Sequence, residues 1–194
     1  GLVGSEMCIR DRCYMFKFFQ NLGRSLMLPV AVLPAAAIIV GIGNALNALH
    51  ALPQVDQFFV AVGTTILEQL GILFAIGVAI GMAKKNDGAV ALASALGFFV
   101  VTKVLSPDKL APILHVKPSS LGEAFDKMDN GNVFVGIIIG LIAAYTYNRF
   151  SETELPLALS FFSGKRLVPI LTAFFCTFIA VILLFVWPVV YNAI

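Results

Sequence analysis

The side chains with the most reactive chemistry in this 194-residue sequence gather near its start. The stretch SEMCIRDRCY places Cys8 and Cys13 among two arginines and two acids. A thiol in a basic setting can ionise and act as a nucleophile. A reactive site also needs a folded domain to hold the group that it handles. The fourteen residues ahead of the next segment cannot build such a domain, so we assign no chemistry to Cys8.

Adjacent cations form a second group of candidates. Lys165 and Arg166 stand together in FFSGKR, directly before an apolar stretch, and Gly164 permits a tight turn ahead of them. Two cations at such a place can attract an anionic partner. They can equally anchor a membrane span, because basic residues collect at its cytoplasmic end.

The remaining candidates flank two other apolar stretches. Arg24 and Met27 lie in GRSLMLP, and Asn148 and Arg149 lie in YNRF. Arg24 can anchor a span, whereas the flexible Met27 side chain could form part of a gate or simply pack against lipid or core. Asn148 and Arg149 could line a cytoplasmic mouth or cap the boundary of a span.

Nothing else in the sequence predicts catalysis. His115 has no second His, Cys or carboxylate at the spacing of a metal site, so we expect it at the surface. Glycine loops that cradle phosphate and nucleophile–base pairs are absent from the sequence. We therefore predict no catalytic residue, no metal site and no cofactor.

The composition indicates where these side chains must sit. The chain is 59% hydrophobic and 12% charged, whereas a soluble domain has about a quarter charged residues. No charged residue occurs between Arg24 and Asp56 or after Arg166. Burying a charge in hydrocarbon is costly, so charge-free blocks predict membrane spans. A net charge of +2 does not indicate nucleic-acid binding.

The charge-free blocks predict an all-α integral membrane protein with five transmembrane helices. We expect these helices at about 25–47, 58–83, 88–105, 132–150 and 167–191. A short interfacial helix is expected in the polar loop 106–131, where Ser120 and Glu123 form a possible capping box.

The first two spans are expected to be irregular. Pro29 and Pro34 predict a kink or a broken start in the first, for which a cleaved signal peptide is the alternative. Glu68 divides the second, and residues 70–83 would make a helix of only about 21 Å, against a hydrocarbon core of about 30 Å. Either the helix begins near Phe58 with Glu68 at the interface, or it is broken at Glu68, as helices on transport pathways often are.

Small residues recur at a spacing of four on three of the predicted spans. Such residues let helix backbones approach closely in lipid, so we expect a tight bundle. They are Gly77 and Gly81, then Ala89, Ala93 and Gly97, then Gly136 and Gly140.

The basic residues predict the orientation. With the N-terminus in the cytoplasm, seven cations lie on the inner face and four on the outer face, which favours this arrangement. The odd number of spans then places Ile194 outside. Tyr145 and Tyr147 are expected to be headgroup anchors at the inner end of the fourth span. The inner set is Lys17, Arg24, Lys84, Lys85, Arg149, Lys165 and Arg166, and the outer set is Lys103, Lys109, Lys117 and Lys127.

Several passages together resemble a known family. They are FFQNLGRSLMLPVAVLPAAAI, LGILFAIGVAIG and LPLALSFFSGKRLVPI, with YNRF and VWP in the same order. From Met15 to Ile194 the chain looks like the membrane IIC domain of the bacterial sugar phosphotransferase system (PTS), glucose/N-acetylglucosamine branch. The resemblance implies the first five of about ten membrane segments, the half that supplies much of a homodimer interface. Most of the sugar pocket would lie in the second half.

The resemblance also implies a function. Such a domain would import N-acetylglucosamine or glucose across the bacterial inner membrane, with coupled phosphorylation of the sugar. The phosphate would come from a phosphorylated IIB domain, supplied in turn by IIA and HPr. The IIB cysteine would lie outside this chain, so the enzyme would be a phosphotransferase only as part of the full system. Under this resemblance, Lys165 and Arg166 would couple sugar release to the docking of IIB.

Residues 1–14 look foreign to that family. LVGSEMCIRDR is similar to a translated sequencing adapter, and MFKFFQNLGRSLMLP resembles a natural start at Met15. CIRDR only faintly resembles the IIB phosphocysteine pattern C-I-T-R-L-R. We expect residues 1–14 to be a non-native leader and residues 15–194 to be a truncated IIC domain.

Two other functions stay open. A secondary transporter without phosphotransfer would need intramembrane carboxylates for its coupling ion, and Glu68 alone could serve. A structural half that scaffolds a membrane dimer would need no site at all.

Overall fold

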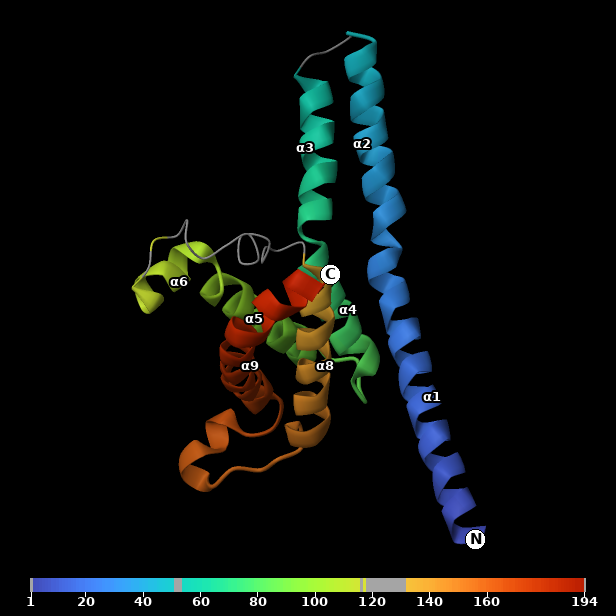
Figure 1. The fold of residues 1–194 in the computed structure, drawn as a ribbon, viewed down its shortest axis with the longest axis vertical. Coiled ribbons are helices and arrows are strands. Elements are labelled where there is room, and N and C mark those ends of the chain that lie inside the picture. The colour runs from blue at the N-terminus through green and yellow to red at the C-terminus, as the bar shows by residue number, and fades with distance from the viewer. Residues whose placement is uncertain (1, 51–53, 116, 118–131, 194) are drawn as a thin grey trace.

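The computed structural model describes residues 2–50, 54–115, 117 and 132–193, and the regular elements in these ranges are all helices. Figure 1 shows a long helical rod, a hairpin that stands away from the body, and a compact group of helices beside the rod. The all-α prediction is confirmed for this part of the chain.

The rod consists of α1 (Leu2–Val30) and α2 (Val32–Ala48), which meet at Ala31 (Figure 1). Pro34 has no N–H to donate to the carbonyl one turn earlier, which weakens the helix at this point. The irregularity is limited to Ala31, whose N–H still donates to the Met27 carbonyl at 3.0 Å, and Arg10–Ala48 runs as one long helix, so the predicted kink or broken start amounts to a single irregular residue. The apolar part of the rod, Arg10–Ala48, is long and apolar enough to cross a membrane.

The second predicted span is also broken. It consists of α3 (Val55–Glu68) and α4 (Leu70–Met82), which are bent by 50° at Gln69. Of the two alternatives for Glu68, the break is confirmed, and the helix also begins slightly earlier than Phe58. The first helix of the pair, α3, runs back along α2 to form the hairpin, whereas α4 packs against α1 and α8 in the body (Figure 1).

The body is completed by α5 (Gly88–Val104), α8 (Val133–Phe150) and α9 (Leu167–Ala193). Side-chain oxygens of Asp87 and Asn132 accept hydrogen bonds from backbone N–H groups in the first turns of α5 and α8, which fixes where both helices begin. Two apolar clusters hold the body together. The larger joins α4, α5, α8 and α9 around Phe98, Ile139 and Cys176, which are fully buried.

A short helix, α6 (Pro107–Leu114), follows α5 after a bend of 57°. It is a short helix within the 106–131 loop, whereas the helix that the capping box predicted from Ser120 falls on residues that the structure does not describe and stays a prediction. Pro107 at its first turn explains the start, because proline fits the end of a helix where an N–H is unpaired in any case. Ser120 and Glu123 lie outside the described residues.

Glycines bring the helices into close contact. A Cβ atom placed on Gly136 would lie 2.1 Å from the backbone oxygen of Gly71, and one on Gly140 would lie 2.6 Å from that of Ala75. The backbones of α4 and α8 therefore nearly touch. Gly77 and Gly81 likewise admit Pro29 and Ser25 of α1. The predicted tight packing at small residues is confirmed at these positions.

Three helices of the described part are long and apolar enough to cross a membrane, and up to five spans result if each bent pair counts as one. The pairs are α3 with α4 and α5 with α6. The predicted number of five spans lies within this range, and it requires that each bent pair crosses the membrane as one span.

Replacing Gly136 with alanine should destabilise the protein by about 1–3 kcal/mol, because the new methyl group overlaps a backbone oxygen that cannot move alone. Thermal unfolding in detergent would measure this. Gly41→Ala is the matched control: no atom lies within 4 Å of its added Cβ, so the gain in helix propensity should leave stability unchanged or slightly raised. Equal melting temperatures for the two variants would contradict the close α4–α8 contact.

Candidate functional site

Four helix ends meet at one end of the body. They are the C-termini of α4 and α8, the N-terminus of α5, and the 3-10 helix η3 (Gly164–Arg166) that leads into α9. We call this region the polar end and define it as residues 82–87, 147–153 and 163–166. Most of the charges of the body lie here or at the opposite end, around α6.

The polar end is organised around Asp87. Its carboxylate forms an ion pair with the ammonium group of Lys165 and accepts a hydrogen bond from the Tyr147 hydroxyl at 3.2 Å. It also accepts a bond from the N–H of Ala89, which caps α5. The bonded Lys165 and the Ala89 N–H hold the pKa of Asp87 below its usual value. One carboxylate thus ties together the beginnings of α5 and α9 and the last turn of α8.

The prediction that Tyr147 is a headgroup anchor is wrong. Its side chain is 1% exposed and belongs to an apolar cluster with Val90, Ala143 and Val168. Its hydroxyl reaches Asp87 from inside the bundle, so the ring packs while the oxygen is paired. Tyr145, two residues earlier on the helix, is 67% exposed, as a headgroup anchor would be.

Asn148 joins α8 to the end of α4. Its side-chain oxygen accepts a hydrogen bond from the Lys84 N–H at 2.7 Å, and its amide nitrogen donates to the Met82 carbonyl at 3.1 Å. These bonds satisfy backbone groups that the end of α4 leaves unpaired. The placement favours the boundary-cap interpretation of Asn148. Arg149 is exposed on the same turn.

The FFSGKR turn is built as the sequence predicts. Gly164 has a φ of +70°, which glycine adopts without strain, and its N–H donates to the Thr153 carbonyl. Lys165 then reaches Asp87. Arg166 contacts Phe161 instead. Its guanidinium lies 4.8 Å from the Phe161 ring and donates a hydrogen bond of 3.4 Å to the Phe161 carbonyl. The two adjacent cations therefore have different partners.

Arg24 and Met27 are not part of this cluster. Both lie on exposed faces of α1, and Met27 is 70% exposed. The face of α1 that packs against α4 is formed by Ser25 and Pro29, which are buried. The structure therefore brings Asn148 and Lys165 together and leaves Arg24 and Met27 outside.

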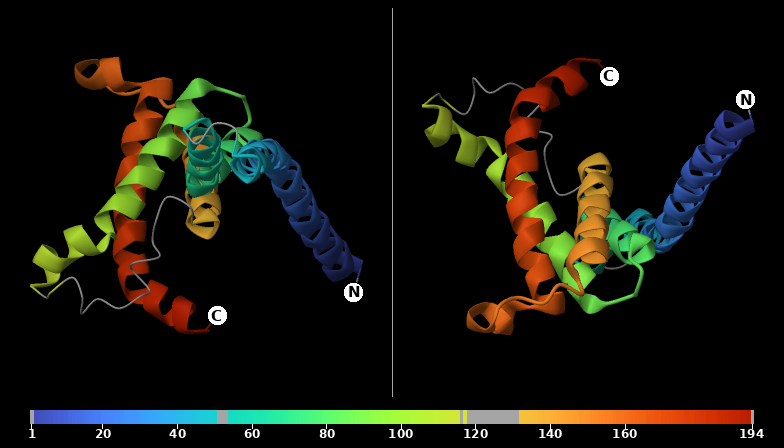
Figure 2. Two further views of the ribbon diagram at one scale, coloured as in Figure 1. Left: turned by 90° about the horizontal axis from the view of Figure 1, so that it is seen from above. Right: turned by 90° about the horizontal axis from the view of Figure 1, so that it is seen from below.

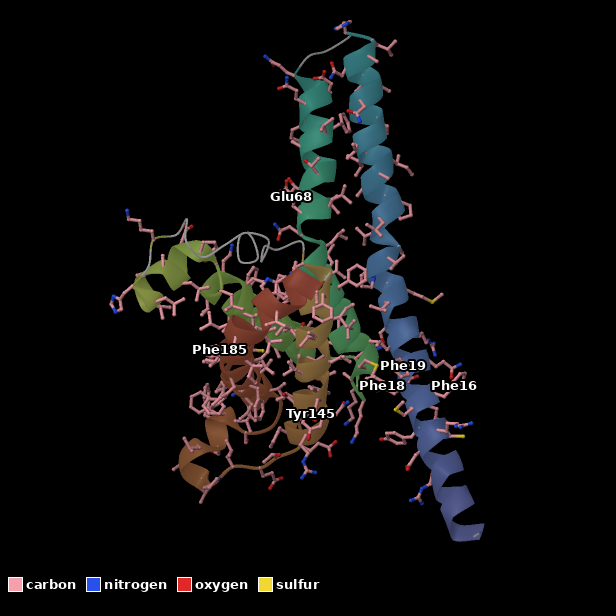
Figure 3. The ribbon with its side chains drawn as sticks, in the orientation of Figure 1. Phe16, Phe18, Phe19, Glu68, Tyr145 and Phe185 are labelled. Carbon is pink, nitrogen blue, oxygen red and sulfur yellow. The ribbon has the colours of Figure 1, made fainter. Side chains whose placement is uncertain are left out.

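A crevice of about 550 Å³ opens between α1, α4 and α8 beside the polar end. Its polar lining groups include Lys17, Asn21 and Asn148, while Arg149 does not line it. Figure 3 shows Tyr145 on the part of α8 near the polar end and Phe18 on the neighbouring stretch of α1, and both also line the crevice. Asn148 thus borders this crevice as well as capping α4, so the structure is compatible with both interpretations.

The described side chains give no arrangement for catalysis. No group of three metal-binding side chains occurs among the residues searched. Cys176 is fully buried in the core, and the side chain of Cys8 lies outside the part that the structure describes. His115 is exposed at the end of α6, as expected. Glu68 is exposed where α3 ends, with no hydrogen-bond or ionic partner within the described ranges (Figure 3). The polar end holds helix ends in place and exposes cations, and none of the serine or threonine hydroxyls described there is bonded to a basic side chain that could activate it.

The cations of the body gather at its two ends. Five of the seven predicted inner cations lie at the polar end, and Lys17 lines the adjoining crevice. Of the outer set, Lys103 and Lys109 lie near the junction of α5 and α6, at the opposite end of α5. The five at the polar end are Lys84, Lys85, Arg149, Lys165 and Arg166.

Sequence reasoning missed Asp87, the residue with the most polar contacts at this end. A signal was present, because Asp immediately before an apolar run is typical of a helix N-cap. Its second role, pairing with a lysine 78 positions later, has no local signal in the sequence.

The matching family model and the similar proteins all belong to one family. The model of the family described as "Phosphotransferase system, EIIC" matches residues 23–194. The N-acetylglucosamine-specific EIICB component of Bacillus subtilis (strain 168) is 42% identical over 180 residues, which cover 93% of this chain and 35% of that protein. The glucosamine-specific EIICBA component of the same organism is 44% identical over 92% of this chain and 27% of its own length. The glucose-specific EIICBA component of Staphylococcus carnosus (strain TM300) is 40% identical over 89% of this chain and 28% of its own length. The chain thus spans about a third or less of the curated relatives it matches.

Acid should weaken the polar end. Because the pKa of Asp87 is lowered in the folded state, its stabilising contribution is present above its ordinary value of 3.8 and is lost as the pH falls below it. The melting temperature in detergent should therefore fall below about pH 4. Asp87→Asn should lower the melting temperature at neutral pH and make it fall less steeply in acid. Glu152→Gln is the control, since its pair with Lys85 is exposed and 3.6 Å long, and it should change neither. An unchanged acid profile in Asp87→Asn would remove Asp87 from this role.

Proposed function

The chain belongs to the EIIC family of the phosphotransferase system, which makes it an integral membrane protein, and we propose that it is the sugar-translocating part of such a system. The observation that carries this proposal is the family match over residues 23–194. The charge-free helices and the segregated cations of the structure support it, because they suit a protein that spans the inner membrane with one basic face.

The proposed topology has five membrane spans and a cytoplasmic N-terminus. Each bent pair of helices counts as one span, so that α3 with α4 forms the second and α5 with α6 the third. The polar end then faces the cytoplasm, and the C-terminal end of α6 lies toward the outside. The concentration of inner-set cations at the polar end supports this orientation.

The proposed substrate is a hexose, either N-acetylglucosamine or glucose. Relatives named for N-acetylglucosamine and glucosamine are 42% and 44% identical to this chain, and the two named for glucose are 37% and 40% identical. The higher values favour a sugar with nitrogen at its second carbon. Most of the sugar pocket is expected in the part of such proteins that this chain does not cover.

The polar end is the proposed docking face for a phosphorylated EIIB domain. Phosphoryl transfer onto a hydroxyl depends mainly on position and electrostatics, so a cationic face beside the exit of the sugar would serve it. Lys165 is already neutralised by Asp87, whereas Lys84 and Arg149 are exposed near it. EIIB would supply the phosphorylated cysteine, and EIIC would orient the sugar. Arg24 and Met27, on the exposed faces of α1, lie apart from this docking face.

The proposed homodimer follows from the family resemblance. The hairpin of α2 and α3 stands away from the body (Figure 1) and offers exposed apolar side chains such as Ile38 and Phe58 to a partner copy. A secondary transporter is the weaker candidate, because Glu68 is the one carboxylate in the predicted spans that could serve a coupling ion. The scaffold alternative is compatible with this chain alone but explains neither the basic face nor the crevice beside it.

A chimera tests the transport proposal. Residues 15–194 replace the corresponding segment of the N-acetylglucosamine-specific relative of Bacillus subtilis, and membrane vesicles are assayed for phosphoenolpyruvate-dependent phosphorylation of labelled sugars. We expect the chimera to phosphorylate N-acetylglucosamine within about tenfold of the parent, because the packing at 42% identity should be retained. The chain alone, with soluble partners added, should form no sugar phosphate. A chimera that inserts in the membrane but phosphorylates neither N-acetylglucosamine nor glucosamine nor glucose would contradict the proposal.

Reporter fusions test the topology. Fluorescent protein fused after Lys85 or Glu152 should fluoresce, because it folds in the cytoplasm, and alkaline phosphatase at these positions should be inactive. The two reporters should give the opposite result after Lys117 and after Ile194. The reverse pattern would place the polar end outside, and equal behaviour after Lys85 and Lys117 would show that α5 with α6 is not a span.

A further inference from the structure

The loop between α8 and α9 contains an unusually exposed apolar segment. It is the 3-10 helix η2 (Leu157–Phe162), and none of its residues is buried. Leu157 is 96% exposed and Phe161 is 70% exposed, with Leu159 and Phe162 at 52% and 43%. Large apolar side chains concentrated in this way on six residues mark a surface that contacts something apolar.

The backbone of η2 is largely satisfied without a neighbour. The Leu159 N–H donates to the Pro156 carbonyl at 2.8 Å, and the Ser163 N–H donates to the Ser160 carbonyl at 3.2 Å. The rings of Phe161 and Phe162 pack edge to face, with centroids 5.3 Å apart. A segment whose backbone groups bond within it can enter an apolar medium at small cost, whereas an open loop cannot.

The position of η2 is fixed by the helices on either side. It follows α8 and precedes α9, and both are long and apolar enough to cross a membrane. Only residues 151–156 separate it from α8, a reach of about 20 Å at full extension. Figures 1 and 2 show η2 beside the start of α9, outside the outline of the bundle. It therefore lies at the level of the headgroups and to the side, where lipid would be.

Arg166 adds a cation to this apolar surface. Its guanidinium lies 4.8 Å from the Phe161 ring and donates to the Phe161 carbonyl, so it is held against η2. Aromatic and leucine side chains next to arginine are typical of segments that lie in the membrane interface. The phosphate groups of anionic lipids would complement this charge.

We propose that η2 is an interfacial anchor: Leu157, Leu159 and Phe161 insert into the boundary between headgroups and acyl chains, and Arg166 binds a lipid phosphate. The anchor fixes the height of the polar end relative to the membrane surface, because η3 and Lys165 follow η2 directly. This inference depends on α8 and α9 crossing the bilayer and not on the sugar or on phosphotransfer. Its failure would therefore leave the proposed function untouched.

Depth-dependent quenching of tryptophan fluorescence tests the anchor. Leu157→Trp is made in a Trp187→Phe background, which gives a single tryptophan, and the full chain is placed in vesicles with lipids brominated either near the headgroup or deep in the chain. We expect stronger quenching by the shallow bromines and little quenching by aqueous acrylamide. Leu96→Trp is the control, because this residue lies in the middle of α5, is 40% exposed and should be quenched more by the deep bromines.

Each other outcome overturns the proposal. Quenching by acrylamide alone would place Leu157 in water, and quenching by neither agent would show that protein covers it, either a second copy or another partner. If Trp187→Phe does not fold, Trp187 is kept and its constant signal is subtracted. Arg166→Gln should abolish any additional shallow quenching that phosphatidylglycerol gives over phosphatidylcholine. An unchanged lipid dependence in that variant would remove Arg166 from the anchor.

Discussion

The exclusion of charge from hydrocarbon is the constraint on which the rest of this structure depends. It explains why α4 and α9 carry no charged residue, why α5 and α8 carry one only in the last turn, and why the charges of the body come together at its two opposite ends. Once the charges meet at an end, they must be paired or solvated. At the polar end Asp87 pairs with Lys165, and Tyr147 reaches the same carboxylate from within the bundle. The site is thus a consequence of how the helices terminate.

Helix packing supplies the second requirement, because apolar surface alone does not hold helices together in lipid. Here contact is made by backbone against backbone, with Gly136 and Gly140 of α8 against the carbonyls of Gly71 and Ala75 on α4. Asn148 adds two hydrogen bonds between the ends of the same two helices. Close packing in the middle and polar bonds at the end therefore support each other, and α4 and α8 form one unit.

The sequence predicted the positions of the helices well, because the charge-free blocks and the prolines act locally. It also predicted the turn at Gly164, from one residue with a clear physical effect, but it left the break near Glu68 as one of two alternatives. It did not predict the role of Tyr147, since a tyrosine at a span end looks the same whether it faces lipid or core. The pairing of Asp87 with Lys165 was also out of reach, because it depends on how distant helices are arranged. For the same reason the sequence could not show that Lys165 and Arg166, though adjacent, would have separate partners.

The bend at Gln69 divides the molecule mechanically. On one side α4 is bound along its length to α1 and α8, and on the other α3 is bound to α2. The two parts are linked by Gln69, where the chain bends by 50°, and by Ala31, which is closely followed by Pro34, a residue with no N–H to donate. A change of angle at these two joints would swing the hairpin as a lever while the contacts inside each part stay intact. Rocking of this kind is what alternating exposure of a cargo requires, so the chain already has the joints for such a motion.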